Sequence, residues 1–317
     1  MKSIALLISP RVKSAYFNDY IKVVMAELSW VLPERKIEPV KIGEMEFLKL
    51  QCLEEELPQL PRLSFVYGVF EYVNEILQPL DLSSDFFLHE DFVFGFKYKG
   101  KTNEILTQML INVGLKSIQY SSLENVKLLD PMCGRATTLL WAMRYGIKAK
   151  GIEHDPKALA DIKQNVKKIS KIHRQKHDFK DGFVGGKASK KQEGKFIDFY
   201  AQSSSMRVIS GDSKNTAKLL NTKEKFDLIV SDIPYGIHHF TTQNTRNPLE
   251  AIKESIDSWK SVLKKEGSIV ISFNNYLPKR KELIELFESF NMKALDFNSA
   301  HRMSESIVRD IVIFKKA

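Results

Sequence analysis

The chain has 317 residues, of which 43% are apolar, so it can bury a sizeable core and global disorder is excluded. Its 48 Lys and Arg against 39 Asp and Glu give a net charge of +9, which favours polyanionic partners such as nucleic acid. Cys52 and Cys133 lack the spacing of a disulfide framework, and the short apolar start excludes a signal peptide, so we expect a soluble, cytoplasmic protein without a membrane partner.

The first part of the chain, residues 1–95, mixes short strand and helix patterns. A strand is predicted at Ile4–Ile8, an amphipathic helix around Tyr20–Leu32, and strand and helix fragments through Leu63–Leu77. This pattern indicates a small α+β module, for which RNA binding is the role to test.

The second part, residues 96–317, begins with a helical pattern at Leu106–Val113 and then alternates strands with helices. The strands are predicted in VKLLD, KAKGIE, MRVISGD, FDLIVSDIP, SIVISF, MKALDF and SIVRDIVIF, and the helices at Thr137–Tyr145, Lys157–Ile169, Leu249–Leu263 and Lys279–Phe290. Repeated βαβ units predict an α/β fold with an open, mostly parallel sheet that carries helices on both faces.

One segment of the second part, His173–Ser204, is rich in Lys, Gly, Ser and His and has no usable periodicity. We interpret residues 173–204 as a mobile, basic insertion. Its composition fits a basic arm on nucleic acid and a solvated insertion equally well.

Polar residues follow the first two strands of the second part. LLDPMCGRATT places Asp130 and the turn Pro131–Gly134, which we call the first turn, at the carboxyl edge of the sheet, where doubly wound folds bind ligands. The second strand ends in GIEHD, so Glu153 lies at the neighbouring tip and can accept both hydroxyls of a ribose. A surface carboxylate that caps the next helix is the alternative, although Asp155 is the better cap.

The third strand ends in SGDS, which brings Asp212 and Ser213 to the same edge. They could hydrogen-bond an adenine amino group and ring, or Asp212 could only cap the following helix. Three successive strands with polar carboxyl ends predict a nucleoside ligand. A nicotinamide cofactor is disfavoured because the first turn lacks the spaced glycines that receive a pyrophosphate.

The fourth strand ends in Ser231-Asp232-Ile233-Pro234-Tyr235-Gly236, which we call the acceptor motif. An exocyclic amine on a purine is a poor nucleophile, so a site that methylates it must orient it. Asp232 can accept one amine hydrogen, the carbonyl before Pro234 can accept the second, and Tyr235 offers a ring on which a flipped base can stack. An ordinary turn after a buried strand is the alternative reading.

Together DPMCGRATT, GIEHD, GDS and SDIPYG resemble the Rossmann-like methyltransferases, and among them the THUMP-associated tRNA guanine-N2 methyltransferase family. The resemblance covers roughly Lys97–Ala317. It implies a seven-stranded sheet whose last strand is antiparallel, S-adenosyl-L-methionine as the methyl donor, and transfer to an exocyclic nitrogen. The smaller α+β module precedes that sheet and is short for the family.

The resemblance also implies roles for individual residues. Those that would contact the cofactor are Thr102, Asp130, Met132, Gly134, Thr137, Glu153, His154, Asp212 and Ser213, and those that would hold the target amine are Asp232, Pro234 and Tyr235. Arg135 departs from the family pattern and could narrow the first turn or place a cation near the cofactor carboxylate. No metal is expected, because no His, Cys and Asp group has metal spacing.

The expected activity is methylation of guanine N2 in tRNA, with RNA as the partner and room for an activating protein subunit. An adenine-N6 enzyme on DNA or RNA, or a glutamine-N5 protein methyltransferase, could use the same acceptor motif, because each acceptor presents an NH2 group that must be oriented. A non-catalytic RNA-binding protein with a methyltransferase fold is the remaining alternative.

Overall fold

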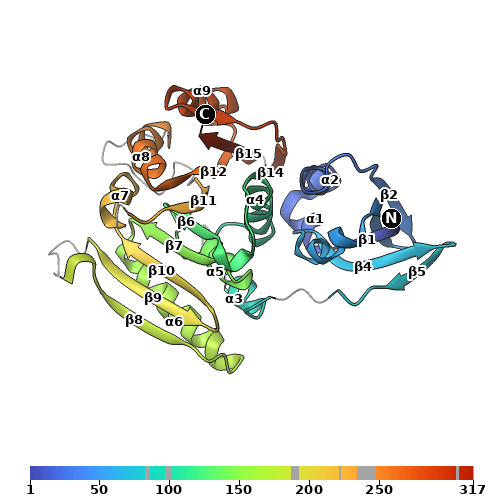
Figure 1. The fold of residues 1–317 in the computed structure, drawn as a ribbon, viewed down its shortest axis with the longest axis horizontal. Coiled ribbons are helices and arrows are strands. Elements are labelled where there is room, and N and C mark those ends of the chain that lie inside the picture. The colour runs from blue at the N-terminus through green and yellow to red at the C-terminus, as the bar shows by residue number, and fades with distance from the viewer. Residues whose placement is uncertain are drawn as a thin grey trace.

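The computed structural model describes residues 1–82, 86–96, 101–186, 193–220, 223–233, 248–304 and 307–316, and it contains two separate β-sheets. Figure 1 shows the smaller, N-terminal sheet on the right and the larger sheet on the left. Among the described residues, no helix combines the length and apolarity needed to cross a membrane.

The N-terminal sheet has the order β2-β3-β1-β4-β5, and all its neighbouring strands are antiparallel. Its strands are β1 (Lys2–Ile8), β2 (Glu38–Ile42), β3 (Met45–Cys52), β4 (Val66–Val73) and β5 (Ile76–Pro79). Its helices are α1 (Arg11–Tyr16), η1 (Phe17–Asp19), α2 (Tyr20–Val31) and η2 (Glu54–Arg62). An α+β module therefore forms where the sequence predicts one.

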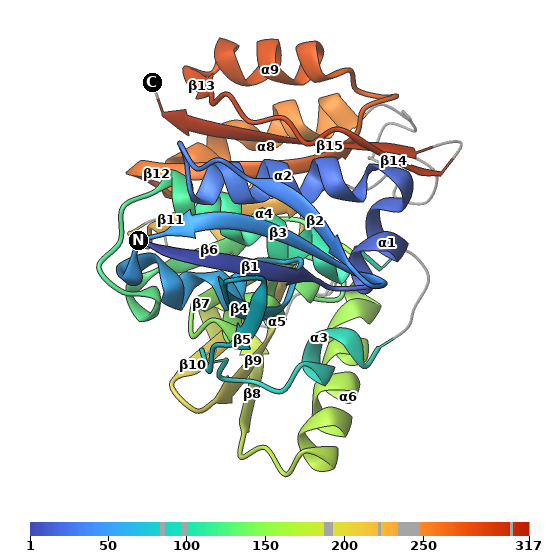
Figure 2. The ribbon, with the colours of Figure 1, turned by 90° about the vertical axis from the view of Figure 1, so that its right-hand side faces the viewer.

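Helices α2 and α4 (Glu104–Ser117) lie between the two sheets and join them (Figures 1 and 2). The indole of Trp30 on α2 donates to the carbonyl of Val113 on α4 at 3.0 Å. Beside it, the buried carboxylate of Glu27 accepts the amide N–H of Ser64 at 3.0 Å and the side-chain amide of Asn112 at 2.7 Å. Polar contacts thus hold the N-terminal module against the helix that opens the second part.

The larger sheet has the order β13-β15-β12-β11-β6-β7-β10-β9-β8, with β14 also paired to β15. Its strands are β6 (Lys127–Asp130), β7 (Lys148–Glu153), β8 (Asp178–Phe183), β9 (Lys195–Ala201), β10 (Ser204–Ser210), β11 (Phe226–Asp232), β12 (Leu263–Asn274), β13 (Met292–Ala294), β14 (His301–Ser304) and β15 (Ile307–Lys316). The helical segments of this part are α3 (Asp91–Phe94), η3 (Leu123–Asn125), α5 (Thr137–Arg144), α6 (Pro156–Ile172), η4 (Val184–Gly186), η5 (Ser213–Asn215), α7 (Thr216–Leu219), α8 (Pro248–Val262) and α9 (Arg280–Ser289).

Seven of these strands reproduce the predicted Rossmann-like sheet. Strands β10, β7, β6, β11 and β12 are parallel neighbours, whereas β15 runs antiparallel to β12 and β13 pairs with β15. The α/β class and the antiparallel last strand are confirmed. Because parallel strands end at one edge, the residues that follow β6, β7, β10 and β11 gather there.

The prediction of a loop over residues 173–204 was wrong for much of that segment. Strands β8 and β9 form an antiparallel pair, and β9 pairs with β10, so the insertion extends the sheet by two strands. Phe179 on β8 packs against the buried Phe199 on β9, with ring centroids 5.1 Å apart. These few apolar contacts stabilise strands whose exposed positions are Lys and Asp, which hid the alternation in the sequence.

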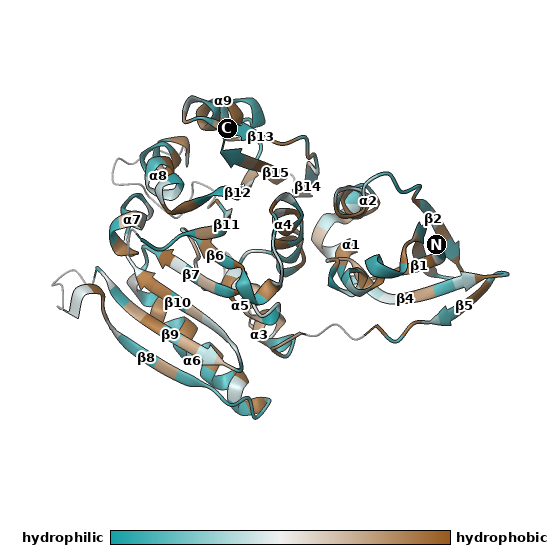
Figure 3. Cartoon of the chain, viewed as in Figure 1, coloured by the Kyte–Doolittle hydropathy of each residue, from teal (hydrophilic) through white to brown (hydrophobic). Residues whose placement is uncertain are grey.

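Helices cover both faces of the larger sheet. Helices α4, α5 and α6 pack on one face and α7, α8 and α9 on the other, each over its own apolar cluster. Apolar residues are concentrated along strands such as β9 and β10 (Figure 3). Gly114 permits the close approach of α4, since a Cβ there would lie 2.7 Å from Leu228 and 3.0 Å from Val270.

Candidate active site

The first turn is held by Asp130, the last residue of β6. Its Oδ1 accepts the amide N–H of Met132 at 3.1 Å and the hydroxyl of Ser231 at 3.0 Å. Burial, with a smaller contribution from the negative charge of Asp232, raises the pKa of Asp130 to about 7, although hydrogen bonds to its carboxylate act to lower it. The carboxyl group of Asp130 therefore links the first turn to the strand that carries the acceptor motif.

Glu153 clamps the first turn to the second strand. One carboxylate oxygen accepts the N–H of Gly134 at 2.8 Å, and the other accepts the N–H of Asp155 at 2.8 Å. Gly134 has φ +53, a left-handed conformation that favours glycine, and a Cβ built there would meet nothing within 4 Å. The turn therefore presents open backbone beside a fixed, nearly buried carboxylate.

Asp212 and Ser213 follow β10 at the same edge. Asp212 Oδ1 accepts the N–H of Lys214 at 3.0 Å, so this residue caps η5 as the alternative reading anticipated. The hydroxyl of Ser213 accepts the indole N–H of Trp259 on α8 at 2.9 Å. His154 lies beside Glu153 with an exposed side chain.

Three further candidates flank the first turn. Met132 is half-buried against the core under α8 and α9, and Thr137 is buried at the first residue of α5. Thr102 is half-buried one residue before Asn103, which caps α4. The indole of Trp141 on α5 donates to the carbonyl of Glu104 at 2.8 Å, so the start of α4 is fixed against the helix that follows the first turn.

Arg135, the departure from the family pattern, has its guanidinium between two acids of the following segment. It bonds Asp155 at 3.3 Å and Asp161 at 3.2 Å. The positive charge of Arg135 is thus balanced on α6. This arrangement differs from the expectation that a cation would lie near the cofactor carboxylate.

Asp232 ends β11, and its side chain is only 10% exposed. It forms an ion pair with Arg309 of β15, whose guanidinium also donates to the hydroxyl of Ser272 at 3.2 Å. The amide N–H of Ile233 donates to the carbonyl of Ser272 at 2.8 Å, which fixes the start of the acceptor motif. Pro234 lies outside the described residues.

The predicted stacking residue, Tyr235, also lies outside the described residues. Arg309, in contrast, was missed by the sequence analysis. The signal for it was a charged pair, Arg309 and Asp310, inside the otherwise apolar run SIVRDIVIF. Buried charges in such a run require partners, and the partner of Arg309 lies 77 residues away.

The hydrogen-bonding groups at this edge fit a nucleoside cofactor. Hydrogen-bond acceptors at the ends of β6, β7 and β10 match the hydroxyl and amino donors of a ribose and an adenine. Each carboxylate oxygen can accept more than one hydrogen bond, so Glu153 can hold the first turn and still accept a ribose hydroxyl. The open backbone at Gly134 allows a ligand to approach closely.

One trio of potential metal ligands comes together within the described ranges, although its members are far apart in the sequence. His89, Asp91 and His173 have ligand atoms within 4.8 Å of one another. The two rings stack 3.7 Å apart with 19° between their planes, so their in-plane nitrogen lone pairs do not converge on one ion. His173 Nε2 lies 2.7 Å from the carboxylate of Asp91, which favours a hydrogen-bonded contact between α3 and α6.

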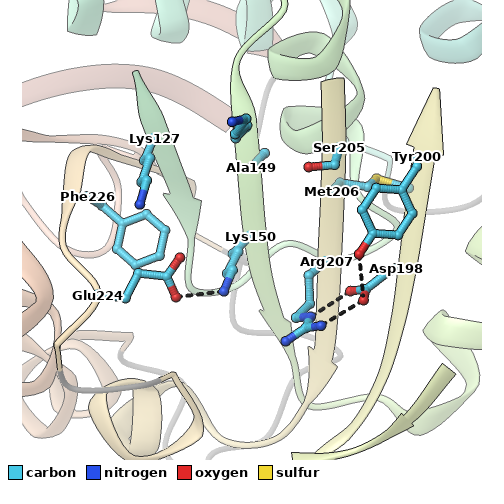
Figure 4. A pocket seen from close by; sticks show the side chains of 11 residues that line it. Lys127, Ala149, Lys150, Asp198, Tyr200, Ser205, Met206, Arg207, Glu224 and Phe226 are labelled. Atoms are coloured by element: carbon cyan, nitrogen blue, oxygen red, sulfur yellow. Dashed lines mark hydrogen bonds and ion pairs between the residues drawn. The ribbon is translucent and has the colours of Figure 1, made fainter. Parts of the chain in front are cut away.

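A hollow of about 300 Å³ lies at the opposite edge of the sheet, where β6 begins at Lys127 (Figure 4). Two ion pairs line it, Lys150 with Glu224 at 2.6 Å and Arg207 with Asp198 at 2.6 Å. The hollow is therefore separate from the carboxyl edge that carries the motifs. Geometry and chemistry favour the carboxyl edge as the active site.

Comparison with known proteins identifies the domain. A family model of the RMKL-like methyltransferase domain matches residues 121–303. A search of curated proteins gives no significant match.

Solved structures share a similar fold at low sequence identity. TrmN from Thermus thermophilus is 12% identical with a TM-score of 0.45, covering 90% of this chain, whereas the chain spans only 60% of the length of TrmN. Precorrin-6y C5,15-methyltransferase from Geobacter metallireducens is 15% identical, with a TM-score of 0.39 and coverage of 65% of this chain and 86% of its own. Fibrillarin pre-rRNA processing protein from Methanococcus jannaschii is 13% identical, with a TM-score of 0.38 and coverage of 90% and 84%.

At these identities none of the solved structures assigns a substrate to this chain. The family model, in contrast, covers more than half of the residues, including the first turn, Glu153, Asp212 and Asp232. The chain therefore belongs to the RMKL-like methyltransferase-domain family.

Proposed function

We propose that this methyltransferase transfers a methyl group from S-adenosylmethionine to an exocyclic amine of an RNA base, with guanine N2 in tRNA as the first substrate to test. The observation that carries the proposal is the position of Asp232 at the end of β11, beside the first turn and joined to it through the Ser231 to Asp130 hydrogen bond at 3.0 Å. A carboxylate so placed can accept a hydrogen from an amine at the cofactor edge.

The cofactor contacts follow from the same edge. Glu153 would accept the ribose hydroxyls, Asp212 the adenine amino group, and the backbone at Gly134 would approach the cofactor closely. Thr102, near the start of α4, is the candidate for the methionine end. When bound, S-adenosylmethionine supplies an electrophilic methyl group and a thioether leaving group.

The chain's own residues orient the acceptor. Asp232 accepts one hydrogen of the amine, which turns the nitrogen lone pair away from the carboxylate and toward the cofactor side of the pocket. The negative charge of Asp232 would stabilise the cation that the amine nitrogen becomes on accepting a methyl group, and the extra proton would leave to water.

RNA is favoured as the substrate class by charge and by the motifs. The net charge of +9 suits a polyanion, and the DPMCGRATT and SDIPYG segments resemble those of the THUMP-associated tRNA guanine-N2 enzymes. Charge alone does not separate RNA from DNA, so the substrate pool must be measured.

The test is incorporation of labelled methyl from S-adenosylmethionine into unmodified tRNA, rRNA, DNA and protein in parallel, followed by nucleoside or amino-acid analysis. N2-methylguanosine in tRNA is the expected product. Label in N6-methyladenine or in glutamine would move the acceptor to the alternatives, and cofactor binding without label in any pool would support a non-catalytic protein.

The variant Asp232→Asn keeps the shape of the side chain and removes its charge. We expect methyl transfer to fall by about 100-fold or more, with affinity for S-adenosylhomocysteine nearly unchanged, because this group faces the acceptor. Unchanged turnover would refute the assigned role of Asp232.

A further inference from the structure

Arg309 reaches the acceptor carboxylate from a different part of the sheet. It lies on β15, the antiparallel last strand, and its guanidinium crosses β12 at Ser272 to pair with Asp232 on β11. Only 6% of the Arg309 side chain and 10% of the Asp232 side chain is exposed. The small side chain of Ser272 leaves room for this crossing, and its hydroxyl accepts a guanidinium N–H at 3.2 Å.

A buried ion pair adds little net stability to a sheet. Desolvation of both groups offsets much of their attraction, and apolar residues of similar size usually serve stability as well or better. The next positions on the same face of β15, Ile311 and Ile313, are apolar and fully buried. On this face of β15 the cation precedes the two apolar positions and reaches the end of β11, which points to a role in the site.

The charges around the pair explain what the cation does there. Asp130 on β6 lies close enough for the charge of Asp232 to raise its pKa, so two carboxyl groups share this edge. On β14, His301 is the strand partner of Arg309. The positive charge of Arg309 also acts to lower the pKa of the Tyr16 phenol on α1, which burial raises. Arg309 supplies the positive charge that balances the carboxylate at the acceptor position.

We propose that Arg309 is a positioning residue that fixes the orientation of Asp232, so that the carboxylate accepts a hydrogen of the target amine. This inference rests on the proposed function. Arg309 itself does not need to touch the base or the cofactor. Its guanidinium is planar and offers several donors, so it can hold Asp232 and Ser272 together in one geometry, which a lysine ammonium cannot reproduce fully.

The experiment compares Arg309→Met and Arg309→Lys with a matched control, Arg280→Met. Arg280 pairs with the buried Asp310, the neighbour of Arg309 on β15, at 2.9 Å, so its loss tests what a broken ion pair costs the fold. For each variant, kcat and KM are measured with unmodified total tRNA from pH 5 to 9. Affinity for S-adenosylhomocysteine and thermal unfolding are measured alongside.

We expect Arg309→Met to lower kcat by about 100-fold, with affinity for S-adenosylhomocysteine within about threefold of wild type, because the acceptor group is misplaced and the cofactor contacts remain. Arg309→Lys keeps a donor to Asp232 and should regain part of kcat. Arg280→Met should lower the unfolding temperature and leave kcat near that of wild type.

Two results would overturn the inference. One is a kcat for Arg309→Met that matches wild type across this pH range, and the other is an equal loss of kcat and cofactor affinity that tracks the loss of stability in both Arg309→Met and Arg280→Met. A double-mutant cycle gives a further check. If both residues act through one carboxylate, adding Arg309→Met to Asp232→Asn should lower kcat little further. Failure of the proposed function is distinguishable, because wild type itself would then label no RNA.

Discussion

The hydroxyl of Ser231 donates a hydrogen bond to Oδ1 of Asp130 at 3.0 Å, and this bond joins the strand that ends in the acceptor motif to the strand that ends in the first turn. The two strands are parallel neighbours, paired at Leu228 with Leu128 and at Ile229 with Leu129. A bond between their carboxyl ends fixes the donor and acceptor sides of the site relative to each other.

The first prediction concerns the titration of Asp130. An Asp side chain in an unfolded chain has a pKa near 3.9, whereas burial raises the pKa of Asp130 to about 7 in the fold. A raised folded pKa means that the wild-type protein loses stability as the pH rises from about 4 through about 7. Asp130→Asn keeps the acceptor oxygen and removes the titration.

We therefore expect the free energy of unfolding of Asp130→Asn, relative to wild type, to rise by about 3–4 kcal/mol between pH 4 and pH 8. Urea denaturation of both proteins at several pH values measures this difference. A difference that does not vary with pH would show that Asp130 keeps the same charge in the folded and unfolded chains.

The second prediction concerns Glu153, whose two oxygens accept the N–H groups of Gly134 and Asp155 at 2.8 Å each. In Glu153→Gln one of these N–H groups faces an amide NH2 and loses its acceptor. We expect affinity for S-adenosylhomocysteine to fall by about 10- to 100-fold, since charge-assisted hydrogen bonds contribute about 1.5–3 kcal/mol each. Calorimetric titration provides the measurement, with the exposed Glu124→Gln as the control.

The same variant separates the two readings of Glu153. Wild-type affinity in Glu153→Gln would leave this residue as a structural clamp with no part in ribose binding. A loss of affinity with an unchanged unfolding temperature would support a direct contact with the cofactor.

Much of the active-site edge follows from local sequence patterns. The run LLD and the helix that starts at Thr137 predict β6, the first turn and α5. Parallel connections then bring Glu153 and Asp212 to the same edge of the sheet as Asp130. Strand periodicity and turn chemistry act over a few residues, so they can be read without the fold. The predicted helix Leu106–Val113 likewise lies inside α4, although its ends were two to four residues short.

The remaining features depend on contacts between distant residues. Nothing near Asp232 in the sequence indicates that Arg309 reaches it across β12, because the two are 77 residues apart. Strand β8 reads DFKDGF, whose charged positions are exposed on both faces, and it forms because β9 offers a paired edge and Phe199. Tertiary pairing decides such segments, and local propensity does not.

The third prediction concerns the contact between the N-terminal module and α4. The buried carboxylate of Glu27 accepts hydrogen bonds from the N–H and hydroxyl of Ser64 and from the amide of Asn112. Glu27→Ala leaves these donors buried without their acceptor, so we expect a loss of about 2–4 kcal/mol in the free energy of unfolding. Glu27→Gln keeps one acceptor oxygen and should lose about 1 kcal/mol.

Chemical denaturation of the full chain measures both Glu27 variants. Equal losses in the two would show that the negative charge, and not the hydrogen-bond acceptor, matters at this contact. No loss in Glu27→Ala would mean that the module is held by apolar packing alone.

The fourth prediction concerns Arg135, which follows the first turn. Its guanidinium pairs with Asp155 at 3.3 Å and Asp161 at 3.1 Å, and its side chain is 27% exposed. Partly exposed ion pairs contribute only about 0.2–1 kcal/mol, so Arg135→Ala should reduce stability slightly. Affinity for S-adenosylhomocysteine should stay within about threefold of wild type, because the charge is balanced on α6. A loss of tenfold or more, measured beside Glu153→Gln in the same titration, would show that the guanidinium leaves these acids to bind the cofactor carboxylate.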